Sequence, residues 1–168
     1  MIIRATNKLL KISGIKPVIL NNNNNGIFPG EWYANIVKTG QVGKLVVLLF
    51  HNTTKISIIC PTKSLNIAIK QLPIRVENYL TRHGFEKLIP KLDLNSEIQI
   101  YTTNSKSTLA YMNPLSFNIE WHLSKTESLK SFDYNDLEDI LSKYLFTDGG
   151  KSGKYETTLI ILERISIT

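Results

Sequence analysis

The chain has 168 residues, of which 42% are hydrophobic and 20% are charged. This length and composition predict one folded domain with a sizeable core, and they exclude a chain that is disordered throughout. The formal net charge is +6, and the presence of a single cysteine, Cys60, excludes an internal disulfide.

No segment of the sequence predicts insertion into a membrane or export. The apolar run KLVVLLF is followed at once by His51 and Asn52, so it falls short of the roughly 18 apolar residues that a membrane span needs. The N-terminal segment reaches Arg4 and Lys8 without the long apolar region and small-residue cleavage site of a secretory signal. We therefore expect a soluble, cytoplasmic protein that makes no membrane contact.

The charge is unevenly distributed along the chain. Residues 1–91 contain 13 lysines and arginines against three glutamates, which gives +10, whereas residues 92–168 contain 7 basic and 11 acidic residues, which gives −4. A basic half of this kind suits an acidic partner, which is a nucleic acid, an anionic protein surface or the acidic half of a second copy. The alternative is that these lysines only keep the surface soluble.

The first thirty residues predict a short strand, a short helix and a loop. The strand begins at Ile2, and Thr6 or Asn7 caps a helical turn that Gly14 ends. The asparagine run that follows offers no apolar side chain for burial, so residues 21–30 are expected to form a mobile loop.

Three consecutive antiparallel strands are expected over residues 31–37, 44–50 and 55–60. Alternation in the first strand sends its side chains to opposite faces, with Trp32, Ala34 and Ile36 on one and Tyr33, Asn35 and Val37 on the other. We expect Trp32 to anchor the core and Asn35 to satisfy backbone groups beside a bend. Cys60 ends an apolar run, which predicts a buried and unreactive thiol.

The second half predicts helices around a second hairpin. A helix starts after Ser64 and is kinked or restarted at Pro73, and residues 97–102 and 107–112 pair as a hairpin. The later elements are a helix opened by Asn113 and Pro114 with Phe117 and Trp121 on one side, a helix capped by Asp133, a glycine-rich linker at 147–154 and a strand at 157–167. The sum is an α+β fold, a single domain over residues 1–168 whose antiparallel sheet is flanked by several helices.

No catalytic or metal-binding signature is present in the sequence. The three histidines, His51, His83 and His122, are far apart, and no HExxH or CxxC spacing preassembles a metal site. The glycine-rich segment 147–154 lacks the GxxxxGK[ST] spacing of a phosphate loop, and no nucleophile elbow is present. We therefore expect no metal and no cofactor, and we favour a protein that is not an enzyme.

Basic residues interleaved with aromatic residues favour a binding surface. Tyrosines in the predicted strands, with lysines at strand ends and turns, suit ribonucleic acid, although no RNP-type consensus is present. Strand aromatics also serve as cross-strand packing, and two arginines seven residues apart on one helix also serve as a solvated face. The candidate binding residues are Arg4, Lys8, Tyr33, Asn35, Lys38, Lys44, Lys55, Arg75 and Arg82.

Three short motifs carry a resemblance to a known family. They are the opening MIIRATNKLL, the segment EWYANIV with Trp32, and STLAYMN ending at Asn113. Over roughly residues 1–123 the chain resembles a family of small bacterial proteins classed as a domain of unknown function, whereas the asparagine run and the tail from Lys125 depart from it. The resemblance implies a bacterial source and a small soluble domain, and it carries no catalytic residue.

Three functions of different classes remain open. The first is a non-enzymatic binding module whose basic half contacts nucleic acid or an acidic protein partner, in a mobile-element, defence or toxin–antitoxin setting. The second is a small enzyme such as a nuclease, using Tyr33, His51 or Asn35 with Arg4. The third is a structural or homo-oligomeric component in which residues 157–167 supply an edge strand for pairing.

Overall fold

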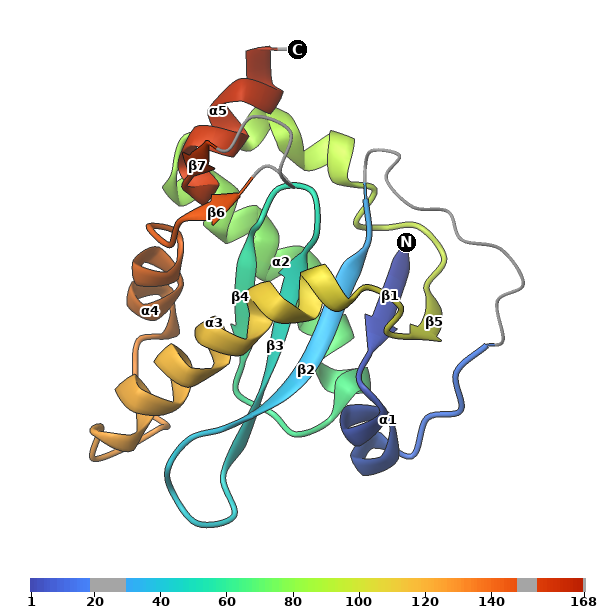
Figure 1. Ribbon diagram of the computed structural model, residues 1–168, viewed down its shortest axis with the longest axis vertical. Coiled ribbons are helices and arrows are strands. Elements are labelled where there is room, and N and C mark those ends of the chain that lie inside the picture. Colours follow the sequence, from blue (N-terminus) through green and yellow to red (C-terminus); the bar gives the residue numbers. More distant parts are fainter. Residues whose placement is uncertain (19–29, 148–153, 168) are drawn as a thin grey trace.

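The computed structural model describes residues 1–18, 30–147 and 154–167, and it shows a five-stranded sheet with helices on both faces (Figure 1). Most of the predicted loop at 21–30 and of the linker at 147–154 lies outside the described residues. The elements in chain order are β1 (Ile2–Ala5), α1 (Asn7–Ser13), β2 (Trp32–Lys38), β3 (Leu45–His51), β4 (Ser57–Cys60), α2 (Leu65–Arg82), the 3-10 helix η1 (Glu86–Leu92), β5 (Gln99–Thr102), α3 (Lys106–Ser124), α4 (Tyr134–Leu141), β6 (Phe146–Thr147), β7 (Tyr155–Glu156) and α5 (Thr158–Ile167).

The main sheet is mixed, with the strand order β4-β3-β2-β1-β5. Strands β2, β3 and β4 pair antiparallel, which confirms the predicted meander. Strand β1 runs parallel to both β2 and β5. The sequence had predicted a sheet that is antiparallel throughout, and this part of the prediction is wrong. Parallel neighbours need a crossover connection, and α1 lies in the connection from β1 to β2. The predicted α+β single-domain layout is confirmed.

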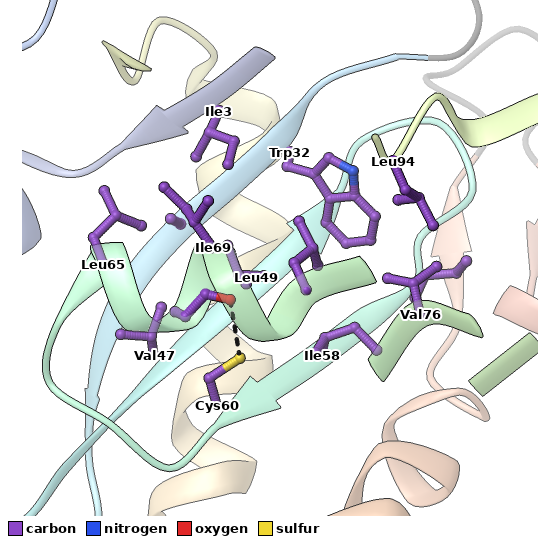
Figure 2. Close-up of a cluster of buried hydrophobic side chains, with 14 of the residues drawn as sticks. Ile3, Trp32, Val47, Leu49, Ile58, Cys60, Leu65, Ile69, Val76 and Leu94 are labelled. Atoms are coloured by element: carbon purple, nitrogen blue, oxygen red, sulfur yellow. Dashed lines mark hydrogen bonds between the residues drawn. The ribbon is translucent and has the colours of Figure 1, made fainter. Parts of the chain in front are cut away.

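The core lies in two layers, one on each face of the main sheet. Trp32, Ala34 and Ile36 of β2 belong to the layer that α2 covers, and Figure 2 shows Trp32 among aliphatic side chains of the sheet and of α2. Tyr33 and Val37 belong to the opposite layer, beneath α3 and α4. The alternation predicted for β2 is therefore confirmed, and Trp32, 1% exposed, is the core anchor that was expected.

Helices α1, α2 and α4 begin directly after the predicted capping residues Thr6, Ser64 and Asp133, of which Asp133 makes a side-chain capping hydrogen bond and Thr6 and Ser64 do not. Helix α1 begins after Thr6 and ends at Gly14, whose φ of 66° is left-handed. Asp133 caps α4 by accepting a backbone N–H at 2.8 Å. Helix α2 begins after Ser64 and runs through Pro73 without restarting there. No helix among residues 1–18, 30–147 and 154–167 combines the length and apolar character needed to cross a membrane.

The predicted second hairpin does not form. Residues 107–112 belong to α3, and β5 pairs with β1 instead. Thr108, Met112 and Leu115 are buried at spacings of three and four residues, so the helical period of this segment outweighs its short alternation. Helix α3 consequently starts before the predicted cap, Asn113.

The predicted C-terminal strand over residues 157–167 is also wrong, because this segment forms α5. Thr158, Ile161 and Leu162 are buried at helical spacing, and this burial overrides the β preference of an isoleucine-rich sequence. The edge strand that was expected to support an oligomer is therefore not provided by this segment.

A buried carboxylate closes the β4 edge of the sheet, where α4 lies alongside (Figure 1). Glu138 of α4 is 1% exposed, and its Oε1 accepts the N–H of Ile59 at 2.9 Å and the Arg75 guanidinium at 2.7 Å. Burial raises the pKa of Glu138, and the neighbouring charge of Arg75 opposes this rise. Glu138 therefore balances the charge of Arg75. It also occupies a backbone N–H of the β4 edge, which protects this edge because exposed strand edges recruit other chains.

Glu138→Ala is expected to destabilise the protein by about 3–5 kcal/mol, because the Ile59 N–H and the Arg75 guanidinium lose their shared acceptor in the interior. Thermal unfolding followed by circular dichroism is expected to show a Tm lower by roughly 6–20 °C. Glu138→Gln keeps an oxygen acceptor for the N–H and is expected to lose less. An unchanged Tm in both variants would contradict the role given to this carboxylate.

Candidate functional site

A polar pocket of about 520 Å³ opens where β2, the β3–β4 loop, the start of α3, the β6–β7 pair and α5 meet. We call it the Lys55 pocket, and the residues that define it are Tyr33, Lys55, Ser105, Ser107, Thr108 and Tyr111. Glu156 of β7 and Arg164 of α5 also line it. Most of the lining residues carry hydroxyl, amide or charged groups, which suits a polar or charged ligand.

The loop that carries Lys55 holds it in a strained conformation. Its φ of 62° is left-handed, a region that a lysine rarely adopts. Its N–H donates to the carbonyl of His51 at 2.9 Å, and its own carbonyl accepts from Thr158 Oγ1 at 3.1 Å. The His51 ring is tied to the loop as well, with Nδ1 lying 2.8 Å from Thr54 Oγ1. The surrounding contacts thus over-determine the backbone, as is typical of strained residues at functional sites.

The Lys55 ammonium lies among aromatic rings. Its Nζ donates to the carbonyl of Asn52 at 2.5 Å and lies 4.9 Å from the ring centre of Tyr111 and 5.8 Å from that of Phe50. Burial penalises the charged form and lowers the pKa of Lys55 to about 8. A large fraction of this lysine is therefore still charged at neutral pH, while a smaller fraction is a neutral amine.

The opposite wall is the first turn of α3. Ser105 Oγ accepts the N–H of Thr108 at 3.2 Å, and the Ser105 carbonyl accepts the N–H of Leu109 at 3.2 Å. The N–H groups of Lys106 and Ser107 have no acceptor among the described residues. Two backbone donors and a group of hydroxyls thus stand at the positive end of the helix dipole, where anions are stabilised.

A buried ion pair lies behind the pocket. Arg4, 3% exposed, donates through Nε and Nη2 to the two carboxylate oxygens of Glu31 at 2.6 and 2.9 Å. The Tyr33 hydroxyl donates to Asn104 Oδ1 at 2.7 Å and lies 3.5 Å from Glu31 Oε2. Burial raises the pKa of Tyr33, and the neighbouring charge of Glu31 adds to this effect. Arg4 is therefore neutralised inside the protein, and Tyr33 links the ion pair to the pocket wall.

The other candidate binding residues are scattered. Arg75 and Arg82 are paired with acidic residues of α4, and Asn35 lies 3.1 Å from the Thr6 hydroxyl, which donates to it. Lys38 and Lys44 are exposed at the β2–β3 turn, the end of the β2–β3 pair opposite His51 and the Lys55 loop, and Lys8 is exposed on α1. The nine residues thus form no common surface, and of them the pocket brings together Tyr33 and Lys55.

The α3 side of the pocket was not predicted from the sequence. Residues 103–106 were expected to form a turn and 107–112 a strand, so the hydroxyls of Ser105, Ser107 and Thr108 were not expected to lie in one group. The signal was present, because a serine immediately before a helical stripe of apolar residues is typical of a helix start.

Other reactive groups lie away from the pocket. The His51 ring is buried against Trp32, with ring centres 4.8 Å apart, and it does not line the pocket. Cys60 is buried as predicted, its thiol lies 3.8 Å from the carbonyl of Ala68 (Figure 2), and burial raises its pKa to about 12. In the part of the chain that the structure describes, no three histidine, cysteine or acidic side chains gather to hold a metal ion.

Replacing Lys55 is expected to stabilise the protein when the new residue tolerates a left-handed φ. Lys55→Asn removes a desolvated charge and suits this conformation, so its Tm at pH 7 is expected to exceed that of the native protein. Lys55→Ala removes the same amine but not the backbone strain, and it is expected to be less stable than Lys55→Asn by about 1 kcal/mol. Thermal melts of the three proteins test this, and a Lys55→Asn protein that melts below the native one would contradict it.

Comparison with known families identifies a domain family that covers most of the chain. A family model described as Domain of unknown function (DUF6933) matches residues 2–157. The match confirms the resemblance to an uncharacterised family, and it continues past the residues 1–123 that suggested this resemblance. No curated protein and no solved structure matches the chain.

Proposed function

The chain belongs to the DUF6933 family, and we propose that it is a binding module that receives a phosphate group of a nucleic acid in the Lys55 pocket. The observation that carries the proposal is that one ammonium, several hydroxyls and Ser107, whose N–H has no acceptor among the described residues, line a single pocket. The description of the family adds no activity to this proposal.

The donors of the pocket favour a phosphate over a single carboxylate. A phosphate presents several oxygens and accepts hydrogen bonds from several directions, which matches donors that come from both the β3–β4 loop and the α3 start. The partly buried ring of Tyr111 lines the same pocket and offers an apolar surface against which a base or sugar can pack. The net charge of +6 supports attraction of a polyanion at longer range.

Binding at the Lys55 pocket differs from binding over a broad basic surface. Three arginines of the basic half are paired with Glu31, Glu138 and Asp139, so the charges of these three arginines are already engaged within the molecule. We infer that recognition depends on one phosphate held closely rather than on many lysines. We also propose the bacterial source, the cytoplasmic location and the mobile-element, defence or toxin–antitoxin setting that were expected from the sequence.

Lys55→Gln is expected to weaken binding of a short single-stranded oligonucleotide by at least tenfold, because a charge-assisted contact to phosphate is lost. Fluorescence anisotropy at two salt concentrations measures this, and the native protein is expected to bind more weakly at the higher salt. Lys44→Gln is the matched control, since it removes the same charge at an exposed position at the other end of the sheet.

Equal losses in the two variants would mean that diffuse charge, not the Lys55 pocket, binds the nucleic acid. A glutamate-rich peptide serves as the second ligand in the same assay. If the peptide binds through Lys55 and the oligonucleotide does not, the partner is an acidic protein and the nucleic-acid proposal is wrong.

Oligonucleotide binding is expected to weaken as the pH rises through about 8, because Lys55 loses its proton there. The bound phosphate favours the ammonium, so affinity is highest below pH 8 and falls by up to tenfold per unit above it, until the pKa of the complex is reached. Glu156, Arg164, Tyr33 and Tyr111 face the same pocket, so Lys55→Arg provides the reference. A Lys55→Arg protein with the same pH profile over pH 7–9.5 would assign the titration to another group.

A further inference from the structure

We propose that Lys55 forms an imine with an aldehyde whose attached phosphate rests on the first turn of α3. This inference deepens the proposed function and depends on it, because the phosphate guides the aldehyde to the amine. It adds a covalent step and a ligand class, a phosphate-bearing carbonyl compound, to what would otherwise be reversible anion binding.

Lys55 is placed as a reactive amine rather than as a surface charge. Its Nζ lines an open pocket beside the rings of Phe50 and Tyr111, and it makes a hydrogen bond to the Asn52 carbonyl. Burial lowers its pKa to about 8, so a much larger share of this lysine is neutral near neutral pH than of an ordinary exposed lysine. Amines that are desolvated in this way are the usual nucleophiles toward carbonyl groups.

The same pocket supplies a separate place for an anion. Ser105, Ser107 and Thr108 stand at the start of α3, and Tyr111 lies one turn further along this helix, beneath the Lys55 ammonium. A ligand that carries a phosphate and an aldehyde can therefore place its phosphate at the start of α3 and its aldehyde at the Lys55 amine, with the ring of Tyr111 between them. A ligand with one of these groups contacts one wall of the pocket.

The strained loop fixes the position of the amine. Both backbone polar groups of Lys55 are hydrogen-bonded, to His51 and to Thr158, and its left-handed φ is held by these contacts. A lysine whose only task is to keep the surface soluble gains nothing from a strained backbone and a desolvated amine. A lysine that must meet a bound carbonyl gains a fixed direction of approach.

The chemical step balances without any further reactant. The neutral Nζ adds its lone pair to the aldehyde carbon, and the carbonyl oxygen takes up the proton that the nitrogen loses, which gives a carbinolamine. Loss of one water then forms the C=N bond, so that amine and aldehyde become imine and water. When this imine is protonated, the positive charge stays beside the phosphate, and the anion-binding character of the pocket is retained.

Two sources present this chemistry. One is a free phosphorylated aldehyde, and the other is the ring-opened sugar of an abasic nucleotide, whose aldehyde lies next to a backbone phosphate. Pyridoxal phosphate serves as the probe for the first source, and a single-stranded oligonucleotide with one abasic position serves for the second.

The test traps the imine by borohydride reduction in the full-length protein and locates the modified lysine by peptide mass spectrometry. We expect Lys55 to be trapped by at least one phosphate-bearing probe, and at least tenfold faster than by pyridoxal, which lacks the phosphate. Lys44 is the internal control, because it is exposed and is expected to react slowly and equally with both compounds. Lys55→Arg cannot form the imine and is expected to lose the trapped product.

The outcomes separate the two proposals. Trapping by the abasic oligonucleotide identifies nucleic acid as the source, and trapping by pyridoxal phosphate alone identifies a free metabolite-like aldehyde. If the intact oligonucleotide binds through Lys55 and neither probe is trapped there, the imine is ruled out and the binding function stands. If Lys55 reacts equally with pyridoxal and pyridoxal phosphate, or if Lys44 reacts as fast as Lys55, phosphate-guided capture is overturned.

Discussion

Strand β3 is buried along residues 46–51, and this burial obliges the protein to cover both faces of its sheet. Helix α2 covers one face, and α3 with α4 covers the other (Figure 1). A strand of this kind reads as a continuous apolar run because it has no solvent side. Once α3 lies across the sheet, its first turn comes to the end of the meander where the β3–β4 loop emerges. The Lys55 pocket is therefore a consequence of how the central strand is buried.

The same packing brings part of the basic half of the chain against part of its acidic half. Arg75 and Arg82 of α2 meet Glu138 and Asp139 of α4 across the β4 edge, so part of the basic half is neutralised by the acidic half of the same chain. Lys55 is treated differently, because it is desolvated and strained without an acidic partner among the ion pairs of the described residues. A left-handed backbone and a desolvated amine both cost stability, and such a cost is the usual mark of a residue retained for function.

Local signals were sufficient where one pattern dominated. The alternation of β2, the turns between β2, β3 and β4, and the capping residues Thr6, Ser64 and Asp133 all indicated the elements that the structure contains. They failed at residues 107–112 and 157–167, where short apolar segments fit a strand and a helix about equally well. In both segments burial at helical spacing decided the outcome, and this burial depends on neighbours that are distant in the sequence. The same distance effect hid the hydroxyls of the α3 start from the site prediction.

The sequence by itself determined the α+β class, the meander, the buried Cys60 and Trp32, and the presence of Tyr33 and Lys55 among the candidate binding residues. These features follow from periodicity, turn chemistry and residue type, which act over a few positions. Only the tertiary structure decided that β1 runs parallel to its neighbours, that Arg4 and Arg75 form ion pairs within the molecule, and that Lys55 lines the same pocket as the start of α3. Such outcomes depend on which buried surfaces meet, and desolvation and hydrogen bonding between residues far apart in the chain act only once the sheet has been covered.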